Sequence, residues 1–516
     1  MHLSKILAFY KNIKVSRQLL FTFAYFILCN TACVLYRFSI YQSSSKYFAV
    51  LESGKDAIYI LAFSYLFFSA ISINRIFFAL ISFALFVSGA AASYYLYFFK
   101  VQVSPRVLTA IFHAESQDVR ELVSLKLLIW MSFVIGVWYF LLSKFAYRPK
   151  RLLGRLFSLA CLCAVTYNIY SPQYRILKYY FPSSYLISLS EYVALRFADK
   201  NFFDISSLDY QDNAAKDLVV VLVIGESARF DRFQINGYIR DNSPNLAAIK
   251  NIRSFKSTSC DSITYTSVPC MLKRAGVAHP RENTFLSVFS KLGFRTSWLA
   301  SQSMLKYLNS LESKIIYDEV DFVLLPGGSL LYPMNTLDQD LLPYLDKMLA
   351  EKEAKKMIVL HTSGSHWDYE ARYTDDFAKY RPTCSGLIHK RDPSYCTRQE
   401  INNMYDNTIL YTDHILSEII TMLKNKNAIV FYTSDHGESL GENEVYGHGG
   451  NNIPEQITVP FFIWTSDSFN NNNPQIQQKI SANDRREIDY RYLFHSILDC
   501  AGIKSMAINL DLSLCR

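Results

Sequence analysis

Five apolar runs in the first third of the chain constrain its fold more than any other feature. Each is close to the roughly 20 residues that an α-helix needs to cross a bilayer. They lie at 19–40, 57–74, 76–99, 125–145 and 152–170. The first run follows four basic residues, and no small-residue cleavage site comes after it, which favours a retained anchor over a removed signal peptide. The sequence therefore predicts a five-helix membrane domain over residues 1–170.

Charged residues in the connecting loops set the orientation of these helices. The N-terminal segment is basic, and the connection after the fourth run carries a second basic group: Lys144, Arg148, Lys150, Arg151 and Arg155. Such loops stay on the cytoplasmic side of a membrane. A chain with five spans that starts inside ends outside. We therefore expect a multi-pass protein of a bacterial inner membrane whose residues after about 171 face the periplasm.

The residues that join the spans to the rest of the chain carry interfacial signals. The loop 100–121 has apolar residues at helical spacing (Val107, Leu108, Ile111 and Phe112), which favours an interfacial helix. The stretch 171–205 is rich in tyrosine and phenylalanine, whose rings favour the headgroup level of a bilayer. We expect residues 171–215 to lie on the outer surface and to bridge the membrane domain to a soluble domain at 216–516.

The ten cysteines divide by region. Four lie within predicted spans, where a cysteine is a small apolar packing residue: Cys29, Cys33, Cys161 and Cys163. The other six form close pairs beyond residue 216, namely Cys260 with Cys270, Cys384 with Cys396, and Cys500 with Cys515. Close pairs in an oxidising compartment favour three disulfides, the last inferred mainly by elimination. A zinc knuckle is the competing interpretation, but no C-x-x-C motif is present.

The soluble domain shows alternating patterns of strands and helices. Five short apolar runs have the composition of buried strands: 218–225, 296–300, 356–362, 428–434 and 459–464. Helical patterns lie between them, notably at 397–423. This alternation predicts a mainly parallel sheet covered by helices on both faces.

Polar side chains follow three of these strands. Glu226 comes directly after the first, His366 follows the third, and Asp435 with His436 follows the fourth, with His448 a little later. In parallel sheets the ligand site lies beyond the carboxyl ends of the strands. Glu226 alone is more often a helix-terminal charge, and His366 or His448 alone is more often a loop or core residue. For Asp435 with His436 alone, the structural and the ligand interpretations are evenly balanced. Their joint arrival at one sheet edge indicates a zinc-type ligand set.

A metal beside a phosphate-type substrate needs a nucleophile. The segment CDSITYTSVPC (260–270) is dense in hydroxyl groups and bracketed by two cysteines. A hydroxyl oxygen bound to zinc ionises near neutral pH and becomes an effective nucleophile. From composition alone, a capping loop at the start of a helix is the competing interpretation.

Five motifs together resemble those of the bacterial lipopolysaccharide phosphoethanolamine transferases, which belong to the alkaline phosphatase and sulfatase superfamily. They read VLVIGESARFDRFQINGYIRDNSPNL (221–246), SCDSITYTSVPCM (259–271), HTSGSHWDYEARY (361–373), CTRQEINNMYDNTILYTDH (396–414) and SDHGESLGENEVYGHGG (434–450). The resemblance covers essentially the whole chain. It implies an N-terminal five-helix transmembrane domain followed by a periplasmic α/β/α sandwich of the alkaline phosphatase and sulfatase type.

The resemblance also implies roles for individual residues. Four match the family's catalytic zinc ligands: Glu226, Thr264, Asp435 and His436. Thr264 also matches the threonine that becomes modified with phosphoethanolamine. His366 and His448 match histidines that bind the phosphate or a second zinc ion.

Several stretches of the sequence bear on which molecule accepts the phosphoethanolamine, and some of them depart from one branch of the family. Lys306 matches a substrate-side lysine of the lipid A-modifying branch, but the CKGVC-like stretch of that branch is replaced by QSMLKYLNSL (302–311). Residues 112–121 also differ from that branch's membrane-side pattern. The stretch 299–319 and the spacing of the last two cysteine pairs look more like transferases that modify the Kdo sugar of the inner core.

We therefore expect a zinc enzyme that transfers phosphoethanolamine from phosphatidylethanolamine to lipopolysaccharide through a threonine-linked intermediate. A sulfatase would need a C/S-x-P-x-R motif, which neither Cys260 nor Cys270 begins. A phosphoglycerol transferase of the lipoteichoic-acid or osmoregulated-glucan type is an alternative that the paired cysteines disfavour. A non-catalytic membrane sensor on the same fold is another, disfavoured by the intact ligand set. The net charge of +8 comes partly from the cytoplasmic loops, and no basic-aromatic pattern indicates nucleic acid.

Overall fold

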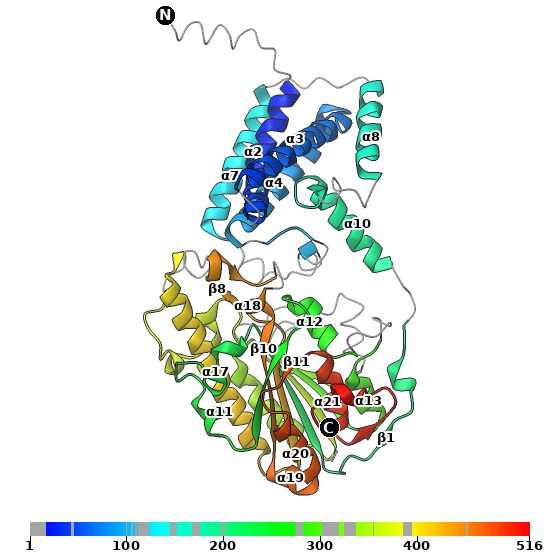
Figure 1. The fold of residues 1–516 in the computed structure, drawn as a ribbon, viewed down its shortest axis with the longest axis vertical. Helices are drawn as coiled ribbons and strands as arrows, with labels where there is room; N and C mark the ends of the chain where they lie inside the picture. Colours follow the sequence, from blue (N-terminus) through cyan, green and yellow to red (C-terminus); the bar gives the residue numbers. More distant parts are fainter. Residues whose placement is uncertain are drawn as a thin grey trace, which may run out of the picture. The chain divides into compact units, whose positions relative to one another are not determined.

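The computed structural model describes residues 17–42, 46–99, 101–104, 107–108, 111, 123–144, 152–167, 176–197, 202–274, 282–301, 319–324, 337–353, 355–384, 395–449 and 453–516. The chain divides into two compact units (Figure 1). Residues 1–109 with 123–198 form the first, here called the membrane unit, and residues 110–122 with 199–516 form the second, the sheet unit. The division after residue 198 falls within the segment that the sequence indicates as a bridge.

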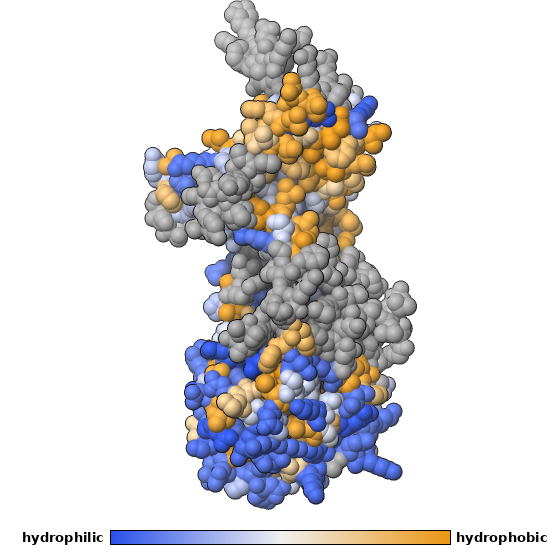
Figure 2. Space-filling model, turned by 90° about the vertical axis from the view of Figure 1, so that its right-hand side faces the viewer, coloured by the Kyte–Doolittle hydropathy of each residue, from blue (hydrophilic) through white to orange (hydrophobic). Residues whose placement is uncertain are grey.

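The membrane unit contains apolar helices at the five predicted positions. They are α2 (Arg17–Gln42), α3 (Lys46–Ala70), α4 (Arg75–Phe99), α7 (Leu125–Lys144) and α8 (Leu152–Tyr167). Among the described residues, three stretches are long and apolar enough to cross a membrane: Gln18–Ser39, Arg75–Phe99 and Leu125–Ser143. Figure 2 shows apolar side chains over the surface of this unit. Length and composition thus support three of the predicted spans, and membrane crossing by α3 and α8 stays a prediction.

The aromatic segment that precedes α10 (Ser183–Phe197) is packed into the membrane unit. Tyr180 and Phe181 are buried, although we expected the rings of this segment on the outer surface. Asn30 of α2 satisfies the Phe181 backbone: its Oδ1 accepts from Phe181 N at 2.7 Å, and its Nδ2 donates to Phe181 O at 3.0 Å. Non-helical backbone is tolerated within a membrane protein when such partners are supplied. The expected interfacial helix at 100–121 lies mostly outside the described residues.

Eight strands of the sheet unit form one mixed sheet in the order β11-β3-β10-β7-β2-β6-β4-β5. Their bounds are β2 (Val219–Gly225), β3 (Ile252–Thr258), β4 (Arg295–Ala300), β5 (Phe322–Leu324), β6 (Lys356–His361), β7 (Ala428–Ser434), β10 (Thr458–Thr465) and β11 (Glu487–Asp489). Strand β10 pairs antiparallel with β3 and β7, and the other described pairs in this sheet are parallel. The mainly parallel sheet predicted from the sequence is confirmed.

The register of the central strands places their carboxyl ends at one level. Ile224 of β2 lies opposite Thr433 of β7 and His361 of β6. The residues that follow these strands therefore emerge side by side at one edge of the sheet. This is the geometric reason that side chains more than 200 positions apart in sequence can form one site.

Helices cover both faces of the sheet, because side chains alternate along each buried strand. Val220, Leu222 and Ile224 face a core that includes α12 (Thr264–Met271), α13 (Phe285–Lys291) and α21 (Arg491–Cys500). Val219, Val221 and Val223 face a core with α11 (Pro244–Ala248), α16 (Leu342–Ala350) and α17 (Arg398–Leu423). Thr397 and Glu400 form a capping box at the start of α17. The helices thus cover the sheet on both faces, as predicted.

The remaining described elements are short. They are η1 (Ile205–Ser207), β1 (Gln211–Asp212), η2 (Phe230–Arg232), η3 (Gln234–Asn236), η4 (Asp338–Leu341), η5 (Tyr369–Arg372), η6 (Asp375–Phe377), β8 (Ser439–Leu440), η9 (Glu442–Glu444), β9 (Tyr446–Gly447), α18 (Pro454–Ile457), α19 (Asp467–Asn472), α20 (Pro474–Ala482), β12 (Ile503–Lys504) and η10 (Leu510–Leu512). Strand β1 pairs with β12, and β8 pairs with β9.

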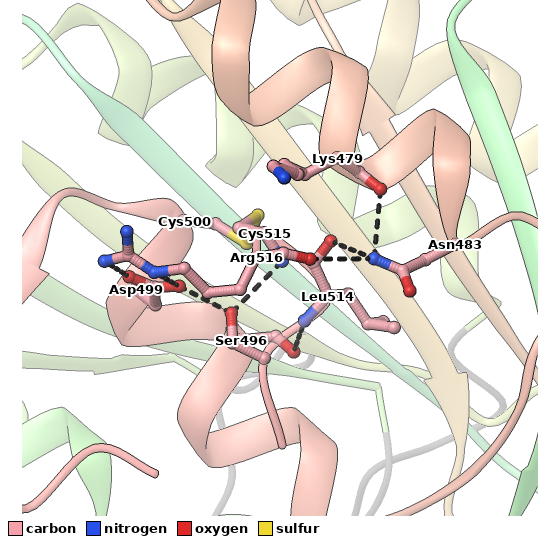
Figure 3. Close-up of a disulfide and its surroundings, with 9 residues drawn as sticks. Lys479, Asn483, Ser496, Asp499, Cys500, Leu514, Cys515 and Arg516 are labelled. Atoms are coloured by element: carbon pink, nitrogen blue, oxygen red, sulfur yellow. Dashed lines mark hydrogen bonds and ion pairs between the residues drawn. A yellow bond between two sulfur atoms is a disulfide. The ribbon is translucent and has the colours of Figure 1, made fainter. Parts of the chain in front are cut away.

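Three disulfides cross-link the sheet unit, as predicted. They join Cys260 to Cys270, Cys384 to Cys396, and Cys500 to Cys515. The last fastens the C-terminal residues to α21, and Arg516 adds an ion pair with Asp499 at 2.6 Å (Figure 3). Cys29 and Cys33 are free and buried in the membrane unit, as expected for packing residues.

Candidate active site

Four side chains of the predicted ligand set meet at the carboxyl edge of the sheet. Glu226 follows β2, Asp435 and His436 follow β7, and Thr264 is the first residue of α12. All four are buried. Strands β2 and β7 are neighbours in parallel register, so Glu226 and Asp435 leave the sheet together. The sequence motifs are therefore assembled by the topology of the sheet.

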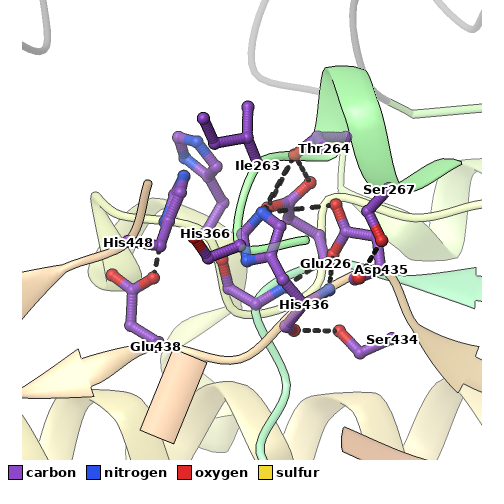
Figure 4. A network of polar contacts seen from close by, with 12 residues as sticks. Glu226, Ile263, Thr264, Ser267, His366, Ser434, Asp435, His436, Glu438 and His448 are labelled. Atoms are coloured by element: carbon purple, nitrogen blue, oxygen red, sulfur yellow. Dashed lines mark hydrogen bonds and ion pairs between the residues drawn. The ribbon is translucent and has the colours of Figure 1, made fainter. Parts of the chain in front are cut away.

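The Thr264 hydroxyl contacts two other members of this group, Glu226 and His436 (Figure 4). Its Oγ1 lies 3.1 Å from Glu226 Oε2 and 3.0 Å from His436 Nε2. The same nitrogen of His436 is 3.3 Å from Glu226 Oε1 and 3.4 Å from Asp435 Oδ2. One nitrogen, one hydroxyl oxygen and two carboxylates thus converge on a common point.

Burial and like charge perturb the ionisation of this group. Burial, followed by the neighbouring Glu226 carboxylate, raises the pKa of Asp435 to about 7. Burial acts to lower the pKa of His436, but the carboxylates of Asp435 and Glu226 outweigh it and raise that pKa above its ordinary value. Two carboxylates held this close repel each other unless positive charge compensates them.

The donor set fits a zinc ion. Among the described residues, the buried Asp435 Oδ2 has no hydrogen-bond partner, and leaving such an acceptor unpaired costs roughly 1–3 kcal/mol or more for a charged group. The other oxygen of Asp435 is occupied, because it accepts from Ser227 N at 3.2 Å and His436 N at 2.7 Å. Carboxylate oxygen and imidazole nitrogen are the ligands that zinc takes from such residues. Glu226, His436 and His448 also offer ligand atoms within 4.8 Å of one another.

His448 and His366 border the group on one side. The His448 ring centroid lies 4.2 Å from that of His436 and 5.7 Å from that of His366. His448 Nδ1 is 2.7 Å from Glu438 Oε2, which leaves Nε2 to face a ligand. Arg372 Nη2 lies 3.3 Å from His366 Nδ1. Both predicted histidines are thus beside the cluster, in positions suited to a phosphate or a second cation.

Glu438 is a site residue to which the sequence analysis gave no role. It is buried, accepts from Tyr369 OH at 3.0 Å through Oε1, and orients His448 through Oε2. Its position in the sequence could have indicated a role in the site, because Glu438 comes three residues after Asp435 in the segment that emerges from the sheet edge. Lys306, the predicted substrate lysine, lies outside the described residues.

Local backbone geometry holds Glu226 in place. Gly364 has a φ of +46°, and a Cβ atom there would lie 2.8 Å from both Glu226 N and Glu226 O. The next residue, Ser365, donates from its backbone N to Glu226 O at 2.8 Å. A side chain at position 364 would therefore displace the carboxylate-bearing segment.

Two family models match the chain. The sulfatase model covers residues 219–503, and the model described as phosphoethanolamine transferase EptA/EptB covers residues 60–197. The first covers the sheet and its site residues, and the second covers most of the membrane unit.

Proteins of known activity resemble the chain over most of its length. The Kdo(2)-lipid A phosphoethanolamine 7''-transferase of Escherichia coli strain K12 is 30% identical over 469 residues, covering 81% of each chain. The integral membrane lipooligosaccharide phosphoethanolamine transferase A of Neisseria meningitidis has the same fold, with a TM-score of 0.81 at 23% identity over 97% of this chain and 98% of the other. The periplasmic domain of EptC from Escherichia coli, solved with zinc, gives a TM-score of 0.53 at 23% identity over 60% of this chain and 89% of that one. The chain belongs to the lipopolysaccharide phosphoethanolamine transferase family, within the alkaline phosphatase and sulfatase superfamily.

Proposed function

We propose that this enzyme transfers phosphoethanolamine from phosphatidylethanolamine to lipopolysaccharide, with Thr264 as the covalent carrier and zinc as the cofactor. The observation that carries the proposal is the position of Thr264 Oγ1, about 3 Å from both Glu226 Oε2 and His436 Nε2 in a buried cluster. A threonine with a merely capping role has no need of two such neighbours.

The first step exchanges one phosphate ester bond for another. Thr264 Oγ1 attacks the phosphorus of the donor lipid, and the bond from phosphorus to the diacylglycerol oxygen breaks. The Thr264 proton passes to the Glu226 carboxylate, to which the hydroxyl donates at 3.1 Å, and the leaving oxygen takes a proton to become the diacylglycerol hydroxyl. His448 is placed to donate it, since Glu438 holds Nδ1 and leaves Nε2 facing the site.

The second step restores the threonine. An acceptor hydroxyl or phosphate oxygen attacks the phosphorus, and the bond from phosphorus to Thr264 Oγ1 breaks. Thr264 regains its proton from Glu226, and the proton of the acceptor hydroxyl returns to His448. His366 and His448 hold the phosphate between the steps, from the side of the cluster where Figure 4 places them. The two displacements leave the phosphoethanolamine group on the acceptor and the enzyme unchanged.

Glu226, Asp435 and His436, together with Thr264, would hold the zinc ion. When bound, zinc would lower the pKa of the Thr264 hydroxyl and neutralise charge on the phosphoryl oxygens. The protein's own contribution is a rigid, water-poor setting for the nucleophile. The disulfide Cys260–Cys270 closes a short loop around Thr264, and Ser267 ties the same helix to the Asp435 backbone at 2.6 Å.

A membrane location suits this chemistry, because donor and acceptor are both lipids of one membrane face. We propose that the membrane unit holds the enzyme in the bacterial inner membrane and that the sheet unit works in the periplasm. Disulfides in the sheet unit are consistent with an oxidising compartment.

Intact-mass measurement of the full-length enzyme tests the covalent carrier. After incubation with phosphatidylethanolamine, the wild-type protein should gain one phosphoethanolamine group, located on Thr264 by peptide mapping. Thr264→Ala should lose both the adduct and transfer. Thr266→Ala is the matched control, because Thr266 belongs to the same helix but its Oγ1 donates to the Ile263 carbonyl at 3.1 Å. An active Thr264→Ala enzyme would exclude this mechanism.

A further inference from the structure

A pair of opposite charges lies inside the membrane unit between α2 and α3. Asp56 of α3 is 1% exposed and accepts three hydrogen bonds at Oδ2. The donors are Arg37 Nε at 3.3 Å, Tyr41 OH at 3.2 Å and Tyr180 OH at 3.0 Å. Ionisable side chains in membrane domains are costly and commonly mark a binding site or a pathway.

The topology predicted from the sequence puts the pair at the depth of the lipid headgroups. The apolar stretch of α2 ends at Ser39, so Arg37 is in its last turn. The apolar run of α3 begins directly after Asp56. Because the N-terminal segment is basic and cytoplasmic by the charge rule, the connection between α2 and α3 lies on the outer side. Arg37 and Asp56 are therefore expected where the outer leaflet presents its polar groups.

Aromatic rings surround the cationic member of the pair. The Arg37 guanidinium carbon lies 4.4 Å from the Tyr41 ring centroid and 4.3 Å from the Tyr179 ring centroid, and Arg37 also donates to Tyr41 OH. Tyr41 and Tyr179 are partly exposed, whereas Asp56 lies beneath them. Tyrosine at this depth has one face in the apolar layer and a hydroxyl in the polar one.

Two polar atoms at this place have no partner among the residues that the structure describes. Asp56 Oδ1 and Ser53 Oγ are both buried and make no hydrogen bond to that part of the chain. Ser53 precedes Asp56 by three residues on α3, so the two side chains share one face of the helix. Unpaired acceptors in an apolar surrounding call for a donor with several N–H groups.

We propose that this charge pair binds the headgroup of a phosphoethanolamine lipid, with the ammonium group at Asp56 and Ser53 and the phosphate at Arg37. A primary ammonium has three N–H donors, and Asp56 and Ser53 offer it two acceptors on one face of α3. The headgroup and the pair each contain one positive and one negative charge, so the complex is neutral. That this lipid is the enzyme's donor rests on the proposed function, whereas the binding itself does not.

A purely structural role makes a different prediction. An ion pair that only fastens α2 to α3 and to Tyr180 would affect stability and would be indifferent to the lipid headgroup. A binding site discriminates between headgroups by their N–H donors. Phosphatidylcholine carries the same charges without an N–H group, and phosphatidylglycerol lacks the cation.

Lipid retention by the full-length protein tests the proposal. The Thr264→Ala variant, which has no carrier hydroxyl, is delipidated in detergent and mixed with dioleoyl phosphatidylethanolamine, phosphatidylcholine or phosphatidylglycerol. Retained lipid is counted by native mass spectrometry. We expect phosphatidylethanolamine to be retained roughly tenfold better than the other two lipids. A factor of this size corresponds to the free energy of one charge-assisted hydrogen bond. Because no transfer is involved, the result is independent of the threonine mechanism.

Added substitutions locate the site. Asp56→Asn should remove the preference for phosphatidylethanolamine, and Ser53→Ala should reduce it several-fold. Lys55→Gln is the matched control on the exposed face of α3, where Lys55 pairs with Glu52, and it should retain the preference. An unchanged preference in Asp56→Asn, or no preference in the parent protein, overturns the proposal. If Asp56→Asn does not fold, Ser53→Ala decides: a reduced preference supports the site and an unchanged one overturns it.

Discussion

Ser267 donates a hydrogen bond of 2.6 Å from its hydroxyl to the backbone carbonyl of Asp435. This bond joins α12, whose first residue is the proposed nucleophile, to the segment that carries two proposed zinc ligands. Both residues are fully buried. The position of Thr264 relative to the ligand cluster is therefore set by a hydrogen bond from the Ser267 side chain to the Asp435 backbone, with the disulfide Cys260–Cys270 as a second restraint.

Ser267→Ala should slow transfer without removing zinc. The substitution leaves the Asp435 carbonyl without this donor and costs about 1–3 kcal/mol of stability, the usual range for an unpaired buried acceptor. We expect a fall in kcat of roughly tenfold with little change in KM for the donor lipid, because misplacement of the nucleophile acts on the chemical step. Steady-state kinetics with phosphatidylethanolamine provide the measurement. Equal kcat values for the variant and the wild type would show that the link has no role in positioning.

Replacement of a proposed ligand should release the metal. His436→Gln should lower the affinity for zinc by roughly 100-fold or more, since even partners of a ligand affect metal affinity 10–100-fold. His495→Gln is the matched control, because His495 is another buried histidine of the sheet unit, whose Nδ1 accepts from Asn509 N at 3.1 Å. Metal content of the purified full-length proteins after equilibration with a chelator gives the comparison. Stoichiometric zinc in His436→Gln would contradict the assignment.

The disulfides should differ in their effect on activity and resemble each other in their effect on stability. Cys260–Cys270 and Cys500–Cys515 close loops of 10 and 15 residues. In the chain-entropy model each contributes about 3 kcal/mol. Replacing either pair by alanine should therefore lower the melting temperature by similar amounts. Only loss of the first pair, which restrains Thr264, should also reduce the rate of adduct formation, so equal rates in the two double variants would argue against a positioning role.

Asp413 should make stability fall as the pH rises through the acidic range. Burial raises the pKa of this α17 carboxyl to about 6, although it accepts from Leu246 N at 2.8 Å and Asn245 N at 3.1 Å. The folded protein then holds a proton that the unfolded chain loses near pH 4. The stabilisation is complete below about pH 4, and about 3 kcal/mol is lost as the pH rises through 6.

Asp413→Asn should remove this contribution, because the side chain can no longer ionise. Melting temperatures of the wild type and the variant should be measured in detergent between pH 4 and pH 7. They should lie close together near pH 4, where Asp413 is protonated, and diverge towards pH 7, where Asp413 ionises. Parallel curves would mean that Asp413 ionises alike in the folded and unfolded states.

The parts of the site that sequence predicted share one physical basis. Val219–Gly225 and Ala428–Ser434 are continuous apolar runs, so both were recognisable as strands buried on two faces. Residues that follow parallel strands meet at one edge, which is why Glu226, Asp435 and His436 could be grouped without a structure. Thr264 was different, because its hydroxyl-rich segment alone favoured a capping loop, and the family resemblance identified it.

Other features depend on contacts that leave little signal in the sequence. Strand β3 (Ile252–Thr258) escaped prediction because Arg253 and Lys256 interrupt its apolar character, and its pairing with β10 is what stabilises it. The link between Glu438 and His448 depends on the tight β8–β9 hairpin, in which Gly441 adopts a φ of +100°. The pairing of Asp56 with Arg37 likewise depends on how α2 and α3 pack, and the sequence shows only isolated charges near helix ends.

The sequence also bears on which part of lipopolysaccharide accepts the phosphoethanolamine. The sequence departs from the pattern of the lipid A-modifying branch at 112–121 and 302–311, while the motifs of the proposed zinc site are intact. Both stretches lie outside the described residues, so the structure adds no geometry there. Specificity comes from contacts around the reacting group, so shared chemistry with a different acceptor is the expected pattern.

We therefore predict that phosphoethanolamine goes to an inner-core sugar, Kdo in the first place, and not to the lipid A phosphates. The 30% identity over 469 residues with a Kdo(2)-lipid A phosphoethanolamine transferase supports this choice, and Lys306 opposes it because its charge suits a lipid A phosphate. Lipopolysaccharide from cells with and without the enzyme should be cleaved by mild acid, and the core and lipid A fractions weighed separately by mass spectrometry. The added phosphoethanolamine should appear in the core fraction and be absent from cells that carry Thr264→Ala. Added mass in lipid A alone would refute the Kdo assignment, because the departures at 112–121 and 302–311 would then have no bearing on which acceptor reaches Thr264.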